Sequence, residues 1–180
     1  MLNTATRYGA ISRTLHWLMA LMIVALVLLG LYMTDLPKAD PARAQIVALH
    51  KAFGVLVLMA WVLRLAWLRI SPAPRLPGEF SRPERRLIKG LQGLLYALMF
   101  LAPAAGYTLS VAGGHPVSVF GLFDLPRLFG ANHALAHLAR ALHAPLAYAL
   151  VGVAALHAMG AIKHRLRDRG GATDVLPRML

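Results

Sequence analysis

The stretch His143–His157, HAPLAYALVGVAALH, places two histidines fourteen positions apart on one apolar segment. Fourteen residues of α-helix rise about 21 Å, and fourteen steps of about 100° return almost to the same face. Both imidazoles therefore lie on one stripe of the predicted helix. One lies toward each side of a hydrocarbon core that is about 30 Å thick. The spacing predicts a spanning helix that presents a polar group at two depths of a membrane.

The composition supports a membrane location for the whole chain. Of its 180 residues, 58% are hydrophobic and only 14% are charged, which is unlike a soluble domain of this size. Four apolar stretches each reach the ~20 residues that a spanning helix needs. We therefore predict an all-α fold, an integral membrane four-helix bundle forming one domain over residues 1–180. The helices are expected at about residues 12–34, 46–69, 86–111 and 140–164.

The first apolar stretch resembles a signal peptide, because Arg7 and Arg13 precede it. Its apolar core, from Trp17 to Met33, is longer than the roughly 7–15 residues of a signal h-region. We expect it to be retained as the first spanning helix.

The distribution of basic residues predicts the orientation. Fourteen of the nineteen Lys and Arg residues lie in the N-terminal tail, in residues 64–89 and from Lys163 onward. By the positive-inside rule, both termini are cytoplasmic. We therefore attribute the net charge of +12 to basic residues at the helix ends, where they meet anionic lipid. No nucleic-acid partner is expected. The chain has no cysteine, which excludes disulfides, iron–sulfur clusters and covalently attached c-type haem.

Two further histidines match the depths of the first two. His16 opens the first apolar stretch and His50 opens the second. With four alternating spans, His16 meets His157 toward the cytoplasmic side and His50 meets His143 toward the outer side. Ionisable residues inside spanning helices are costly and usually functional. The four histidines predict two b-type haems, an inner one and an outer one. Two imidazole ligands leave the iron no open position, which suits electron transfer.

Three glycines are candidates for helix surfaces against which a flat macrocycle packs. Gly30 lies fourteen positions after His16, at the depth of the outer haem, and Gly93 and Gly106 lie on the third predicted helix. Ordinary packing of small residues between helices would explain the same glycines equally well.

Two basic residues are candidate partners of haem propionates. Arg64 lies fourteen positions after His50, level with the inner haem, where a buried guanidinium needs an anion. Alternatively, the Arg64 side chain extends toward the cytoplasmic headgroups. Lys51 is the candidate on the outer side.

The remaining polar candidates lie near the helix ends. His164 follows His157 by seven positions and, with Arg13, is a candidate for quinone binding or proton delivery, although a surface histidine would look the same. His115, His133 and His137 are expected in the external loop, where no role is assigned to them. His133 and His137 have the i,i+4 spacing of metal ligands, but solvated loop histidines are the simpler interpretation. No metal other than haem iron is predicted.

These motifs resemble the bacterial cytochrome b561 family, small four-helix di-haem b proteins of the inner membrane. The similarity covers nearly the whole chain and rests on SRTLHWLMA around His16 and ALHKAFGVLVLMAWVLRL from His50 to Arg64. It rests also on the His143–His157 spacing followed by His164. The resemblance implies His16, His50, His143 and His157 as haem ligands. One member of the family is a superoxide oxidase that passes electrons to ubiquinone, which implies a quinone or proton role for His164.

Three functions remain open from the sequence. The first is a redox enzyme that moves electrons from an external donor, with superoxide as the candidate, through two haems to ubiquinone. The second is a cytochrome subunit that passes electrons between a partner dehydrogenase or hydrogenase and the quinone pool. The third is a haem-free bundle acting in transport or as a scaffold. The absence of a large extramembrane module in the sequence favours the first. The external face carries a net charge of only +2, so electrostatic steering of an anion would be modest.

Overall fold

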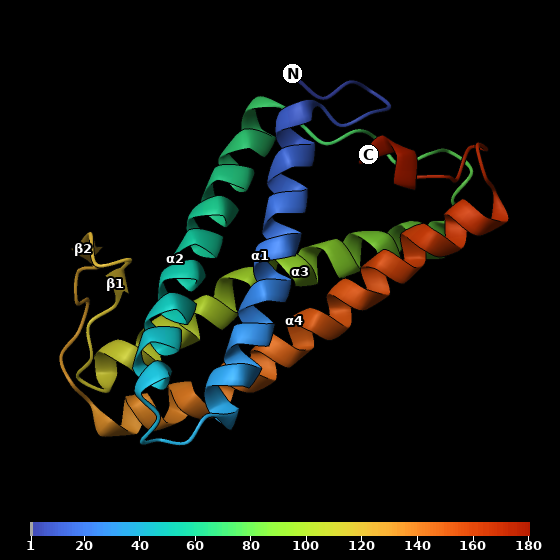
Figure 1. Cartoon of the computed structure of the whole chain (residues 1–180). Coiled ribbons are helices and arrows are strands. Elements are labelled where there is room, and N and C mark those ends of the chain that lie inside the picture. The colour runs from blue at the N-terminus through green and yellow to red at the C-terminus, as the bar shows by residue number, and fades with distance from the viewer. Residues whose placement is uncertain (1) are drawn as a thin grey trace.

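The computed structural model describes residues 2–180 and is almost entirely helical (Figure 1). Its elements in chain order are α1 (Ala10–Asp35), α2 (Pro41–Ile70), α3 (Arg82–Ala112), β1 (Ser118–Val119), β2 (Phe123–Asp124), α4 (His133–Arg167) and the 3-10 turn η1 (Leu176–Arg178). All four α-helices are long and apolar enough to cross a membrane. The predicted all-α membrane four-helix bundle is confirmed.

Polar residues immediately before three of the helices define where those helices begin. The Asp40 side chain accepts a hydrogen bond from the Ala42 amide at the start of α2. Ser81 and Glu84 form a reciprocal capping box at the start of α3. The Asn132 side chain accepts from the Leu135 amide at the start of α4. These side chains satisfy amides that would otherwise lack an intrahelical partner.

The fourth helix begins at His133, well before the expected start near residue 140. His133 and His137 therefore lie in the first two turns of α4 and not in a loop, although both are exposed. The apolar stretch alone misplaced this boundary, because a helix can extend beyond the hydrocarbon core into the headgroup region. Asn132 is the signal that marks the true start.

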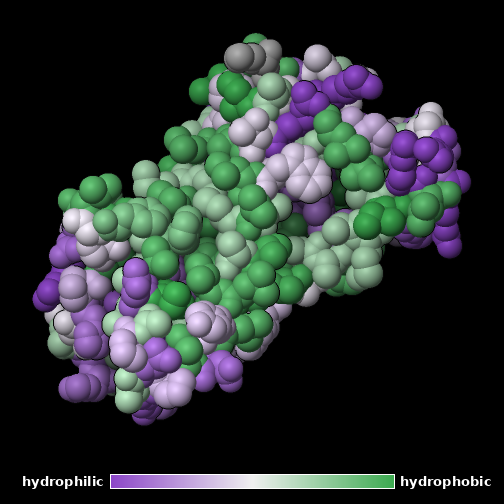
Figure 2. Space-filling view, viewed as in Figure 1, coloured by the Kyte–Doolittle hydropathy of each residue, from purple (hydrophilic) through white to green (hydrophobic). Residues whose placement is uncertain are grey.

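A wide apolar surface covers the middle of the bundle. Only 6% of the most apolar segment is buried inside the protein in both α1 and α4, so few of their side chains are fully enclosed by the bundle. Leu21, Val24 and Leu28 are exposed along α1. Figure 2 shows hydrophobic side chains across the centre of the molecule and hydrophilic ones gathered at its two ends. Lipid is the solvent that such a band requires.

The helices associate as two sequential hairpins. α1 packs on α2, and α3 packs extensively on α4, with α2 and α3 joining the two hairpins. By contrast, the backbone of α4 has at most isolated close approaches to α1 and α2. Figure 1 shows the α1–α2 pair crossing the α3–α4 pair at an angle, and Figure 2 shows a hollow on this face between the N-terminal half of α1 and α4.

The connection between α3 and α4 forms a small antiparallel hairpin beside α2 (Figure 1). Val117 and Val119 are buried against Val55 of α2 and Val111 of α3. Its turn contains Phe120 and Gly121, both with positive φ angles, of 53° and 72°. A positive φ is costly for a bulky residue, and the Phe120 ring packs edge-on against Phe53 at 5.3 Å between centroids.

Candidate haem-binding site

The structure brings the four membrane histidines together in the two pairs expected from the sequence. His16 of α1 faces His157 of α4, with 6.3 Å between the ring centroids and 67° between the ring planes. His50 of α2 faces His143 of α4, with 6.1 Å and 90°. All four side chains are half-buried. α4 therefore contributes one imidazole to each pair.

The spacing within each pair fits two imidazoles that share one metal ion. A metal–imidazole nitrogen bond is about 2.0 Å, so two rings on opposite sides of one metal have centroids about 6 Å apart. Both observed separations, 6.3 Å and 6.1 Å, agree with this value. The rings meet across the space that the backbones of α1 and α2 leave beside α4. A flat group held edge-on between the two hairpins requires a space of this kind.

A backbone hydrogen bond orients His143. Its Nδ1 lies 2.9 Å from the carbonyl oxygen of Ala102 on α3. A ligating histidine typically donates its second ring N–H to a carbonyl or carboxylate, which fixes the tautomer and leaves Nε2 for the metal. The other member of the outer pair differs: His50 Nδ1 is buried near the Leu26 carbonyl, but makes no hydrogen bond of ordinary geometry.

Two of the three predicted glycines lie against the outer pair. A Cβ at Gly106 would be only 2.9 Å from Cε1 of His143, and a Cβ at Gly30 would be 3.3 Å from Cε1 of His50. Both glycines therefore make room for an imidazole. At Gly93 a Cβ would meet no atom within 4 Å, so the space beside this part of α3 is open. The packing of Gly30, Gly93 and Gly106 against a macrocycle stays a prediction.

Arg64 lies beside the inner pair, close enough to act electrostatically on both His16 and His157. Its Nε donates to the Tyr96 hydroxyl at 2.9 Å, while its Nη1 is buried without a hydrogen-bond partner in the described chain. A buried guanidinium with a free N–H is costly unless an anion completes it. A haem propionate meets that requirement, so the donor set fits a haem at the inner pair.

Tyr8 lies near Arg64, outside the spanning segments. Burial raises the pKa of the Tyr8 phenol above its usual value, against the opposing effect of the cations Arg178 and Arg64. The phenol is therefore protonated at neutral pH. It adds a proton-bearing group at this end of the molecule without adding charge.

The other predicted residues have partners of their own. Lys51 Nζ donates to the Pro116 carbonyl at 3.3 Å, so an outer propionate would compete with the hairpin for it. Arg13 donates to a terminal oxygen of Leu180. The His164 ring packs edge-on against Phe80, at 4.9 Å between centroids. No hydrogen bond in residues 2–180 joins Arg13, Arg64 and His164 to one another, although the three lie toward the same end of the bundle.

The remaining histidines do not form a second metal site. His115 lies in the loop before β1, and His133 and His137 are exposed on α4. Within the described residues, no cluster of three His, Cys, Asp or Glu side chains could hold a metal ion.

Sequence reasoning missed three groups at the site. Tyr96 holds the Arg64 guanidinium, the Ala102 carbonyl orients His143, and the Trp17 ring stands edge-on to His16 at 5.2 Å. Trp17 adjoins a predicted ligand and could have been suspected. The other two lie 32 and 41 positions from their partners, and no periodic pattern connects them.

Four membrane-spanning helices with two facing histidine pairs define a class, the integral-membrane b-type cytochromes. The family model of prokaryotic cytochrome b561 matches residues 7–180. Cytochrome b561 homolog 2 of Escherichia coli (strain K12) is 38% identical over 178 residues, which cover 99% of this chain and 93% of that protein. The chain belongs to the prokaryotic cytochrome b561 family. It is therefore a multi-pass protein of the bacterial inner membrane, in a family that binds b-type haem and transfers electrons.

Replacing Gly106 tests the close approach of α3 to the outer pair. In Gly106→Ala the new methyl group would lie within 3 Å of the His143 ring, so the imidazole must shift from its present position facing His50. We expect less haem per purified chain and an altered spectrum of one centre only. Gly152→Ala is the matched control, because a Cβ there meets nothing within 4 Å. Equal haem content in both variants would show that Gly106 is not needed for this approach.

Proposed function

We propose that the chain binds two haem b groups, one between His16 and His157 and one between His50 and His143. We further propose that it transfers electrons from superoxide on the outer side of the membrane to ubiquinone. The observation that carries the proposal is the pair of facing imidazole rings at 6.3 Å and 6.1 Å, both completed by α4. When bound by these histidines, the haems would supply two one-electron carriers.

The chain's own residues would fix these carriers at two depths. His143 and His157 are separated by about 21 Å of helix rise, so one lies near each side of the hydrocarbon core. The Ala102 carbonyl keeps Nε2 of His143 available. Arg64 would neutralise a propionate at the inner position through its free Nη1. Lys51 is a weaker candidate on the outer side, because the Pro116 carbonyl already engages it.

The orientation rests on the charge pattern. The two chain ends lie at the same end of the bundle, where the Tyr8 amide donates to the Arg178 carbonyl (Figure 1). Since fourteen of the nineteen Lys and Arg residues lie at this end, the positive-inside rule makes it cytoplasmic. The pair His50–His143 would then face the external donor, and the pair His16–His157 the acceptor.

The overall reaction balances with a small anionic donor. Two superoxide anions each lose one electron and leave as O₂. Ubiquinone takes up these two electrons with two protons and becomes ubiquinol. His164 is the candidate proton donor at the cytoplasmic end, because histidine is the side chain that most often acts as a general acid. Arg13, the other candidate, already donates to the Leu180 backbone oxygen.

The haem assignment is tested by single histidine replacements. We expect two haems per wild-type chain by pyridine haemochrome analysis, and one in each of His16→Ala, His50→Ala, His143→Ala and His157→Ala. The first and last should lose the inner centre, and the middle two the outer centre, as seen by redox titration. His133→Ala, an exposed histidine on the same helix as two of the ligands, should keep both. If His16→Ala and His50→Ala removed the same centre, the pairing would be wrong.

The donor and acceptor are tested by stopped-flow spectroscopy of the wild-type protein. Superoxide alone should reduce the haems, and prior addition of ubiquinone should return them to the oxidised state during turnover. Haems that superoxide leaves oxidised, but that a co-purifying dehydrogenase reduces, would show that the protein is an electron-transfer subunit.

The proton role of His164 is tested in the same apparatus. His164→Ala should retain both haems and their reduction by superoxide. Re-oxidation by ubiquinone should slow by an order of magnitude or more, since a general acid contributes roughly 10²–10⁴ in rate. Lys163→Gln changes a charge at the neighbouring position and should re-oxidise normally. Unchanged re-oxidation in His164→Ala would place proton delivery elsewhere.

A further inference from the structure

The two helices that carry the inner histidine pair have little direct backbone contact. α4 packs on α3 and has at most isolated close approaches to α1. Figure 1 shows α1 and α4 diverging toward the end that carries both termini. His16 nevertheless faces His157 at 6.3 Å at this diverging end. Besides the packing through α2 and α3, another segment of the chain connects α1 with α4 at this end.

The last three residues, Arg178–Leu180, which we call the C-terminal strap, contact three other segments. The Arg178 carbonyl accepts a hydrogen bond from the Tyr8 amide at 3.1 Å. Its guanidinium donates from Nε to the Thr6 carbonyl and from Nη2 to the Arg75 carbonyl. One side chain thus joins the segment before α1 to the connection between α2 and α3.

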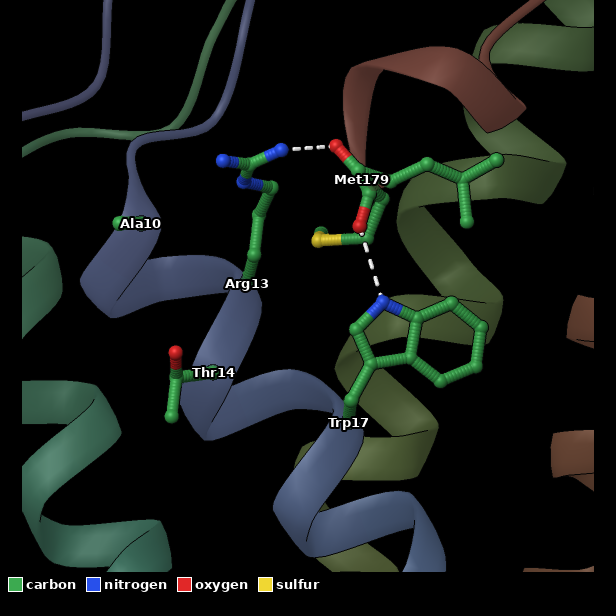
Figure 3. A pocket seen from close by; sticks show the side chains of 6 residues that line it. Ala10, Arg13, Thr14, Trp17 and Met179 are labelled. Carbon is green, nitrogen blue, oxygen red and sulfur yellow. Dashed lines mark hydrogen bonds between the residues drawn. The ribbon is translucent and has the colours of Figure 1, made fainter.

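The end of the strap binds α1 directly (Figure 3). Trp17 Nε1 donates to the Met179 carbonyl at 2.9 Å, and Arg13 donates to a terminal oxygen of Leu180. The Trp17 ring that makes the first of these bonds stands edge-on to His16. The Met179 carbonyl and His16 of the inner pair are therefore separated by a single side chain, that of Trp17.

The beginning of the tail is tied to α4. Arg165 of α4 forms an ion pair with Asp174, and the Gly170 amide donates to the same carboxylate. These hydrogen bonds, the Gly170 amide first, lower the pKa of Asp174 below its usual value, so the carboxylate stays ionised at neutral pH. The tail is consequently anchored at both ends, on α4 at Asp174 and on α1 at Arg13 and Trp17.

We propose that the C-terminal strap is a positioning element that spans the opening between α4 and α1 and holds Trp17 against His16, with the Leu180 backbone oxygen as a further anchor on Arg13. A single exposed hydrogen bond contributes little. The strap acts through this bond together with the hydrogen bonds of Arg178 and Met179. Its effect on the inner centre rests on the proposed haem function, whereas its docking on α1 does not.

Two variants loosen the strap without removing it. Arg178→Gln removes the guanidinium that donates to the Thr6 and Arg75 carbonyls, and Arg13→Gln removes the guanidinium that donates to the Leu180 backbone oxygen. Arg69→Gln is the control. It removes a positive charge from an exposed side chain of α2 at the same end of the bundle. Each is compared with the wild-type full chain.

Hydrogen exchange measures the docking, whether or not haem is bound. The Tyr8 amide, which the strap carbonyl protects, should exchange about tenfold faster in both variants, in line with loss of hydrogen bonds involving charged groups. The neighbouring Gly9 amide donates to Asn3 Oδ1 and serves as the internal reference. Unchanged Tyr8 exchange in both variants would overturn the proposal.

Electron paramagnetic resonance measures the effect on the inner centre. The spectrum of a ferric ion with two imidazole ligands depends on the angle between their planes, which is 67° for the inner pair and 90° for the outer pair. In both variants the signal of the inner centre should shift while that of the outer centre and the haem content stay constant. A loosened strap with an unchanged inner signal would refute positioning. Faster re-oxidation by ubiquinone with an unchanged signal would refute it too, since the strap would then merely obstruct the acceptor.

Discussion

The arrangement of the four helices and their histidine pairs depends on one helix that carries two imidazoles fourteen positions apart. His143 and His157 lie on the same stripe of α4, and each faces one histidine of the α1–α2 hairpin. Because the period of the α-helix relates depth to direction, any shift of α4 along its axis would change both pairs together. The glycines at 30 and 106, and the carbonyl of Ala102, are arranged around this alignment.

Unpaired polar groups in the apolar interior also lie near these histidine pairs. A buried donor or acceptor without a partner is costly, and at the helix starts most such groups are capped. Two of the exceptions in the described residues are His50 Nδ1 and Arg64 Nη1, and each lies at one of the histidine pairs. Both of these unpaired polar atoms of the membrane region thus belong to residues at the histidine pairs.

Periodicity accounts for the part of this structure that could be predicted from the sequence. Helical spacing and hydropathy predicted the four spans and the pairing of His16 with His157 and of His50 with His143. Both patterns are local and repeat along the chain. The start of α4 was misplaced, since hydropathy does not detect a cap such as Asn132. The Tyr96 hydroxyl on Arg64 and the Pro116 carbonyl on Lys51 were also not foreseen. Such contacts depend on how helices cross and loops return, which leaves no periodic trace.

The division into two helical hairpins has a consequence for biogenesis. In a bilayer, helices insert first and associate afterwards, and the hydrophobic effect does little to drive their association. Here α1–α2 and α3–α4 can each form from neighbouring segments. The two hairpins are then joined by α2 and α3, by β1 against α2 and by the C-terminal strap, while α4 makes at most isolated close backbone approaches to α1 and α2. A ligand that bridges histidines of both hairpins would therefore add contacts that the backbones do not make. In cells starved of haem, the newly inserted chain would depend on the other contacts alone to hold its two hairpins together.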